Sequence, residues 1–302
     1  MNLLQLIQAV SYEIGLTAPN QVVGNTDTQV TQLLYLANSI GTELRREFPW
    51  QALNREYRFY TQFLTTTGDT VNGSAVVSNI PSTAQLNNKY LVTGTGIPFQ
   101  DVGVQTVDNS NQVTLTVPCN ETQIGATLNF GQTKYELPPD YDRQIDRTHY
   151  DKSKRWEMLG PETPQQWEFL KSSYISTGPR IRYRIMGGFF QIWPITTTNE
   201  LLGFEYISKA WVDDASGTPK NEFTADTDTC IYHDRLMING IKLRFFEVKG
   251  FDTSAFYRDF INQLQIAKSN DAGSLTLGMS PKASTVLIGY ENIPDGSIYG
   301  QG

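Results

Sequence analysis

The chain has 302 residues, a mass of 34.0 kDa and a net charge of −7, from 24 basic and 31 acidic residues. This length is typical of about two domains, and the acidic balance gives the molecule as a whole no attraction for nucleic acid. The two cysteines, Cys119 and Cys230, lie in unrelated contexts, which argues against a disulfide framework or a zinc site, and no window approaches the roughly 18 apolar residues of a membrane span.

Two amphipathic helices are predicted at the N-terminus. The apolar residues from Leu3 to Ile14 fall on one helical face that ends at Gly15. The second helix starts at the capping-box pattern Thr26–Gln29 and continues to Phe48-Pro49. The stretch LNREYRFYTQFL that follows alternates in the manner of a strand.

Residues 65–131 differ in composition from their surroundings. Lys89 is the only basic residue among them, and Thr, Val, Asn and Gly dominate short runs between turns. The candidate strands are Ser74–Val77, Lys89–Val92, Val102–Val107, Gln112–Val117 and Ala126–Phe130. We therefore expect a small all-β domain, of sandwich or barrel type, inserted at a surface loop of a parent domain.

The parent domain resumes with a charged, aromatic stretch. The pattern Thr163-Pro164-Gln165-Gln166 supplies an N-cap, an N1 proline and a capping-box glutamine, so a short helix begins there. A hairpin is predicted around Gly187-Gly188, because two glycines can take the positive φ angles of a primed turn. Residues Leu201–Trp211 are predicted to form a further strand.

Two long helices, at Thr227–Lys249 and Asp252–Ser269, are predicted to close the globular part, with Gly250 between them. Their apolar faces can pack against the two N-terminal helices. Residues 273–302 are rich in Gly, Ser and Thr and have too few apolar residues for a core. The predicted fold class is therefore α+β: a four-helix bundle core with a β-rich middle region, an inserted small all-β domain and an extended C-terminal arm.

Signals for catalysis are weak. The two histidines, His149 and His233, have acidic neighbours, as a hydrolase or metal site would require, but a hydrogen-bonded structural histidine is the more common case. Cys230 and His233 would lie one turn apart on the predicted helix, with no third member of a site in view. Asp213-Asp214 lies in a turn-like run, and the nucleotide-binding and hydrolase motifs are missing. We expect no catalytic residues, no cofactor and no metal.

The stretch from Arg143 to Arg184 is locally basic although the chain is acidic. Arg180, Arg182 and Arg184 alternate and would share one face of a strand. A solvated face or a protein interface is the more common meaning of such a run, and a nucleic-acid lining is the alternative. The candidate interface residues are Arg143, Arg147, Lys154, Arg155, Arg180, Arg182 and Arg184.

Several motifs in this region are those of a known family. They are Tyr135-Glu-Leu-Pro-Pro-Asp-Tyr-Asp-Arg143, Arg155-Trp156, Leu159-Gly-Pro161, Pro164-x-x-Trp167, Gly178-Pro-Arg180, Tyr183-Arg184 and Gln191-Ile-Trp-Pro194. In these motifs the chain resembles the head-to-tail adaptor proteins of short-tailed bacteriophages, of the tail tubular protein A type. The resemblance covers the chain apart from residues 65–131.

The resemblance implies a structural virion protein that is not an enzyme. Its partners would be the portal protein, the tail nozzle protein, further copies of itself in a ring of twelve, and genomic double-stranded DNA passing through the channel, with no membrane. It implies an adaptor core at 1–64 and 132–272, the insert at 65–131 and an arm at 273–302, in a protein assembled in the host cytoplasm. The arm residues expected to contact the portal or a neighbouring adaptor are Leu275, Val286, Leu287, Ile288, Tyr290, Ile298 and Tyr299.

Other functions remain open from the sequence. A nozzle, baseplate or fibre-attachment protein of the tail would use the insert as an outer module that contacts a fibre or the host. A hydrolase would depend on His149 or His233. A free nucleic-acid-binding protein would lose affinity steeply with salt.

Overall fold

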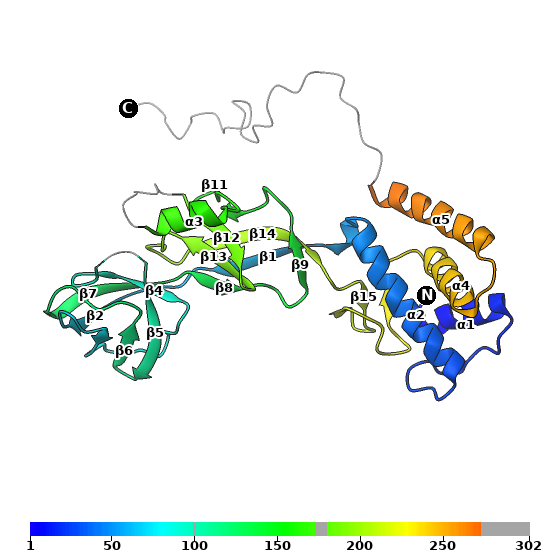
Figure 1. Ribbon diagram of the computed structural model, residues 1–302, viewed down its shortest axis with the longest axis horizontal. Helices are drawn as coiled ribbons and strands as arrows, with labels where there is room; N and C mark the ends of the chain where they lie inside the picture. Colours follow the sequence, from blue (N-terminus) through cyan, green and yellow to red (C-terminus); the bar gives the residue numbers. More distant parts are fainter. Residues whose placement is uncertain (99–100, 173–179, 273–302) are drawn as a thin grey trace, which may run out of the picture.

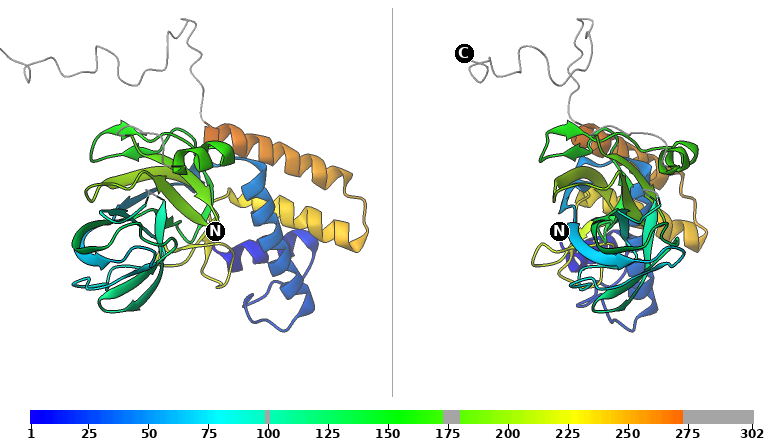
Figure 2. Two further views of the ribbon diagram at one scale, coloured as in Figure 1. Left: turned by 60° about the vertical axis from the view of Figure 1, so that its left-hand side comes forward. Right: turned by 90° about the vertical axis from the view of Figure 1, so that its left-hand side faces the viewer.

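The computed structural model describes residues 1–98, 101–172 and 180–272. In these residues the molecule is elongated, with four of the five α-helices at one end and a strongly curved β-sheet at the other (Figure 1). Two further sheets and the short helix α3 (Pro164–Lys171) lie between them (Figures 1 and 2). All the sheets pair antiparallel.

The helical end contains four helices and one turn of 3-10 helix. They are α1 (Leu3–Ile14), α2 (Thr28–Glu47), η1 (Gln51–Leu53), α4 (Asp234–Lys249) and α5 (Ser254–Ala272). Both N-terminal helices are confirmed, and their ends follow from local chemistry: Asn2 and Gln5 form a capping box on α1, Gly15 ends it at a φ of 76°, and Asp27 caps α2. The cap of α2 is Asp27, one residue after the Thr26 that the sequence indicates.

The helix predicted at Thr227–Lys249 starts seven residues later. Thr229–Cys230 forms strand β17, which pairs with β15 (Val212–Asp213), and β16 (Pro219–Lys220) covers the other edge of β15. Asp228 holds this small sheet in place: its buried carboxylate accepts hydrogen bonds from Lys220 and from the backbone of Thr224 and Ala225 at 2.8–2.9 Å. These bonds favour an extended chain at a position where apolar spacing indicates a helix.

The prediction of a four-helix bundle core is wrong. The described chain is mostly β, with seventeen strands in four sheets and only five α-helices. The hydrophobic core at the helical end also takes Trp50, Trp211, Phe223 and Tyr232 from outside the helices, and α5 contributes only Leu264 as a buried residue. Helices α1, α2 and α4 therefore pack on non-helical chain as well as on each other, and α5 lies on the outside (Figure 2).

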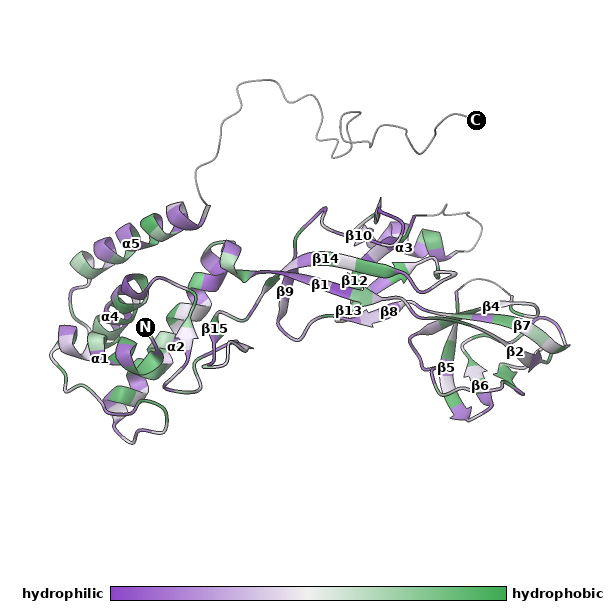
Figure 3. Ribbon diagram, turned by 180° about the vertical axis from the view of Figure 1, so that it is seen from behind, coloured by the Kyte–Doolittle hydropathy of each residue, from purple (hydrophilic) through white to green (hydrophobic). Residues whose placement is uncertain are grey.

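The two middle sheets pack around one aromatic core. The first contains β1 (Asn54–Tyr60), β14 (Leu201–Ser208), β10 (Tyr150–Asp151) and β11 (Trp156–Glu157), with β9 (Tyr141–Gln144) also paired to β14. The second contains β12 (Arg182–Met186), β13 (Phe189–Trp193) and β8 (Lys134–Glu136). The predicted Gly187-Gly188 hairpin is confirmed, since Met186 pairs with Phe189 and both glycines have positive φ. Along β1 exposed and half-buried residues alternate, and most of this strand is hydrophilic in Figure 3.

The sheet at the far end nearly closes into a barrel. Its strand order is β2-β7-β4-β5-β6-β3, with bounds β2 (Phe63–Thr70), β3 (Val76–Val77), β4 (Tyr90–Gly94), β5 (Val102–Asn109), β6 (Gln112–Leu115) and β7 (Gln123–Gln132). A bridge between Asp69 and Ser78 joins the two edges of the sheet, with backbone hydrogen bonds of 2.8 and 3.1 Å. The barrel encloses its own hydrophobic core, centred on Val92, Leu128 and Phe130.

Helix α3 fixes the barrel against the middle sheets. It begins with the predicted Thr163–Gln166 capping box and N1 proline. Its Trp167 and Leu170 are buried with Trp193 and contact Leu91 of the barrel.

Candidate assembly surfaces

A hollow of about 540 Å³ lies on the outer face of the first middle sheet. Arg147 and Arg155 both line it, from the turn before β10 and from the β10–β11 turn. Both have positive φ, 63° and 60°, a backbone conformation that is rare for residues with a Cβ. Such strain persists where the surrounding structure holds it, often at functional positions.

Two other charges of the hollow, Glu56 and Lys152, pair with each other. Glu56 accepts hydrogen bonds from Arg58 at 2.5 Å and from Lys152, and these bonds lower the pKa of Glu56 to about 2. Arg147 and Arg155 are exposed, and neither forms an ion pair with any residue that the structure describes. The hollow therefore presents two cations without an ion-pair partner, beside the exposed Glu205, which lines it as well.

The remaining basic residues that the sequence singles out do not gather at this hollow. Lys154 binds the buried Glu200 at 2.5 Å, and Arg182 binds Glu162 at 2.6 Å, so both serve internal contacts. Arg143 is exposed on β9, Arg184 is half-buried on β12, and Arg180 is exposed just before that strand. The seven positions thus separate into internal partners and dispersed surface charges, a division that the sequence alone does not reveal.

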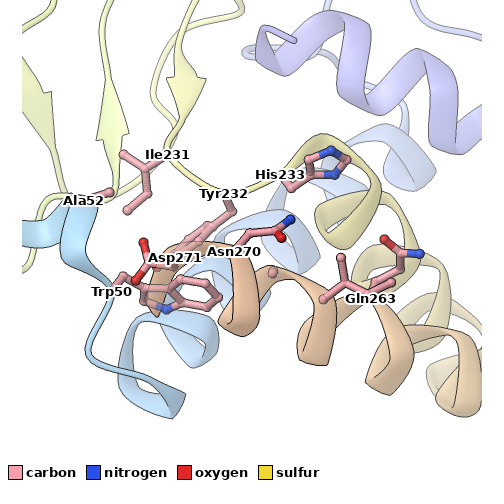
Figure 4. A pocket seen from close by; sticks show the side chains of 10 residues that line it. Trp50, Ala52, Ile231, Tyr232, His233, Gln263, Asn270 and Asp271 are labelled. Atoms are coloured by element: carbon pink, nitrogen blue, oxygen red, sulfur yellow. The ribbon is translucent and has the colours of Figure 1, made fainter. Parts of the chain in front are cut away.

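A second concave site, of about 300 Å³, lies at the C-terminal end of α5. Its lining is mainly apolar, with polar residues at the rim (Figure 4), and comprises Trp50, Ala52, Ile231, Tyr232, His233, Gln263, Ile266, Ala267, Asn270 and Asp271. The Asp271 carboxylate accepts a hydrogen bond from the backbone of Gln51 at 2.8 Å, which joins the end of α5 to η1. The predicted arm begins two residues later, and all seven of its candidate contact residues lie outside the described residues.

Exposed apolar side chains mark the helical end. Large hydrophobic residues that are more than half exposed on these helices and their α4–α5 turn are Tyr12, Tyr35, Val248, Phe251, Tyr257 and Ile266. Single exposed apolar residues are common on any protein. Six at the helical end, with aromatic residues among them, have the composition that interface centres favour.

Neither histidine is placed for catalysis. His149 is buried, stacks on Tyr183 at a centroid distance of 4.0 Å and hydrogen-bonds its hydroxyl through Nδ1 at 3.0 Å. Burial lowers the pKa of His149 to about 4, so the ring is neutral at pH 7. His233 is the N-cap of α4, where its Nδ1 accepts a hydrogen bond from the backbone of Arg235. Cys230 lies on β17 and not on that helix, so the predicted one-turn pairing with His233 is wrong.

Of the adjacent residues Asp213 and Asp214, the first lies in β15 and the second stabilises a turn. The Asp214 side chain accepts hydrogen bonds from Ser216 and Thr218, and the bond from the Ser216 hydroxyl is the main reason that the pKa of Asp214 falls to about 2. Both cysteines are free. In the described part of the chain, three or more metal-ligating side chains gather nowhere, and no helix has the length and apolarity to span a membrane.

Comparison with known proteins bears on these surfaces. Residues 104–278 match the SU10 adaptor protein family. The match starts within β5, so it includes the second half of the barrel, a region to which the motifs named above do not extend. A search of curated proteins finds no match. Because the family match covers more than half of the 302 residues, the chain belongs to the SU10 adaptor protein family and is a structural protein of the bacteriophage head-to-tail adaptor type.

Proposed function

We propose that this protein forms a ring, of twelve copies, between the portal and the tail nozzle of a phage and helps to form the channel for the genome. Membership of the adaptor family carries this proposal. An adaptor functions through surfaces and not through a reaction, and both histidines of this chain have structural roles within it. The protein would be part of the virion neck, assembled in the host cytoplasm.

We propose that the chain is divided into domains according to its separate hydrophobic cores. Residues 1–64 and 132–272 would form the adaptor core, 65–131 an inserted domain and 273–302 an arm. The separate core of the barrel and the separate core at the helical end support this division. The exposed apolar side chains on the helical end favour that end as the contact between ring subunits or with the portal.

The arm would bind the portal or a neighbouring adaptor through its apolar residues. These are Leu275, Val286, Leu287, Ile288, Tyr290, Ile298 and Tyr299. Support comes from the composition of the segment and from its starting point beside the concave site at the end of α5. Binding would bury apolar surface that the chain has no core of its own to cover.

The basic region would face a neighbouring subunit, the nozzle or the DNA. It comprises Arg143, Arg147, Lys154, Arg155, Arg180, Arg182 and Arg184. Arg147 and Arg155 are the best candidates for direct contact because both are exposed and line one hollow. An acidic protein can line a DNA channel, since a channel that must release DNA requires weak contact and not tight phosphate binding.

A second candidate function is another tail component, such as a nozzle, baseplate or fibre-attachment protein. The placement of the barrel at the opposite end from the helices favours this alternative, because an outer module has to project from the body (Figure 1). In that case the barrel would contact a tail fibre or the host.

The test is the mass of the purified chain, alone and mixed with the portal of the same phage, together with proteolysis of residues 273–302 in both samples. We expect a complex with one adaptor per portal subunit and a tail that is protected only in the complex. Leu287→Asp with Ile288→Asp should abolish the complex, while the matched control Ser284→Asp with Thr285→Asp should retain it. A chain that stays monomeric and does not bind the portal would refute the adaptor role and favour the second candidate.

A further inference from the structure

The chain passes from the first middle sheet into the barrel at a buried junction. Thr61, between β1 and β2, is completely buried. Its backbone N–H donates to the carbonyl of Glu200 at 2.8 Å, and its hydroxyl oxygen accepts from the backbone N–H of Glu200 at 2.7 Å. The same hydroxyl donates to the carbonyl of Thr198 at 3.2 Å. The segment before β14 therefore holds the entry strand of the barrel through its own backbone.

Two acidic side chains are buried at this junction. Glu200 is 2% exposed and Asp151, on β10, is 3% exposed, and Lys154 contacts both, Glu200 through Nζ and Asp151 through its backbone N–H. An ionised carboxylate can only accept hydrogen bonds, so two neighbouring carboxyl groups can bond to each other only when one of them carries a proton. Glu200 Oε2 is buried, and the described residues offer it no donor. A proton on this oxygen would remove one buried charge and would give Glu200 a donor for a neighbouring acceptor.

The charges around Asp151 and Glu200 also favour one proton on the pair. Lys154 Nζ lies 2.5 Å from Glu200 Oε1, and the Asp151 carboxylate accepts from the backbone N–H groups of Ser153 and Lys154 at 3.0 and 3.1 Å. The phenol of Tyr135, from β8, is the other titratable group that faces Glu200. With one proton, the two carboxyl groups and the lysine are neutral together, whereas without it they carry a buried negative charge, which is costly.

We propose that Asp151 and Glu200 share one proton in the folded protein, and that this proton locks the junction between the middle sheets and the barrel. Loss of the proton places two negative charges side by side, of which Lys154 compensates only one. The repulsion weakens the hydrogen bonds between Glu200 and Thr61, so the junction opens more often at these two residues. The lock is a property of the fold and does not depend on the proposed place in the phage neck.

The pH range of the lock follows from the environment of Glu200. Burial, and then the neighbouring Asp151, raise the pKa of Glu200 above its ordinary value of 4.5, with Lys154 opposing them. A raised pKa in the folded state means that the stabilisation is complete below pH 4.5 and is lost as the pH rises through the folded value. One linked proton changes the opening equilibrium by up to about tenfold per pH unit between pH 4.5 and that value, and the dependence levels off above it.

The first test is infrared spectroscopy of the intact protein at neutral pH. A carbonyl band of a protonated carboxylic acid should be present, and Glu200→Gln should remove it. The matched control is Glu205→Gln, which makes the same change at an exposed position on the same side of the molecule, in β14, and should keep the band. If Glu200→Gln does not fold, the band of the unmodified protein still decides, and its absence overturns the proposal.

The second test is hydrogen exchange at the amides of Thr61 and Glu200 between pH 5 and 9, corrected for the intrinsic exchange rate. In the unmodified chain and in Glu205→Gln, protection at both amides should fall by up to about tenfold per pH unit until the pH reaches the pKa of the pair, and should then level off. Glu200→Gln should remove this dependence, because an amide cannot lose a proton in this range. An equal dependence in Glu200→Gln and the unmodified chain would overturn the proposal.

Discussion

Substitution of Gly41 by alanine tests how the helical end is held together. Gly41 lies in α2, and a Cβ added there would be 2.1 Å from Cη2 of the Trp211 indole, which is 1% exposed. Ordinary van der Waals contact begins at 3.4 Å, so the ring would have to retreat by roughly 1 Å or more in a packed core. The Gly41 carbonyl also accepts a hydrogen bond from the Tyr232 hydroxyl at 3.2 Å, which limits any shift of the helix.

Two opposing effects decide the size of the change. Alanine is favoured over glycine in a helix by about 1 kcal/mol, whereas an extra carbon in a packed core costs typically about 1–3 kcal/mol. With a clash this close we expect the upper end of that cost, and a net loss of about 2 kcal/mol in the free energy of unfolding. Urea unfolding monitored by circular dichroism measures it.

The control is Gly41→Ala in a variant whose side chain at position 211 is smaller. In a Trp211→Phe background the smaller ring leaves room for the new methyl group, so Gly41→Ala should cost less than it does in the unmodified chain. A double-mutant cycle should therefore give a favourable coupling energy. If Gly41→Ala is neutral or stabilising in the unmodified chain, the close packing of α2 on Trp211 is refuted.

Four further predictions concern stability and titration. Thr163→Ala should lower the free energy of unfolding by about 1 kcal/mol, because it removes the cap of α3, and an unchanged urea midpoint would contradict that role. Asp228→Ala should cost about 3 kcal/mol, since it leaves Lys220 and two backbone N–H groups without their buried partner; a loss below about 1 kcal/mol would show that the small sheet does not depend on it. Arg147→Gly should raise stability by about 0.5 kcal/mol, because it relieves the positive φ, while it weakens assembly; loss of stability on calorimetry would contradict the strain. The His149 ring should titrate near pH 4 by NMR, so its stabilising contribution is complete above pH 6.5 and is lost as the pH falls through 4, whereas a measured pKa near 6.5 would contradict its burial.

The sequence was most informative where a local rule determines the structure. Helix α3 begins at its predicted capping box, and the Gly187-Gly188 turn joins the predicted strands. Apolar spacing found α1 and α2, because a helix that packs on one side repeats every 3.6 residues. Such signals lie within a few neighbouring residues and do not depend on the rest of the chain.

Long-range contacts were not predictable in the same way. The start of α4 depends on Asp228, whose backbone partners favour a strand where the apolar pattern favours a helix. The bundle prediction failed because a periodic face shows that a helix packs on something but does not identify the partner, which for α2 is Trp211. The role of Lys154 was hidden for the same reason, since Glu200 lies 46 residues away in sequence and nothing local indicates that it is buried.

Cryo-electron microscopy of the intact virion can show whether this chain forms the proposed adaptor ring of a phage neck. We expect density for the barrel, the middle sheets and the helical end between the portal and the tail nozzle, in a ring of twelve copies with residues 273–302 against the portal or the next subunit. Density for this chain at the outside of the tail, or its absence from the portal junction, would refute the proposed role.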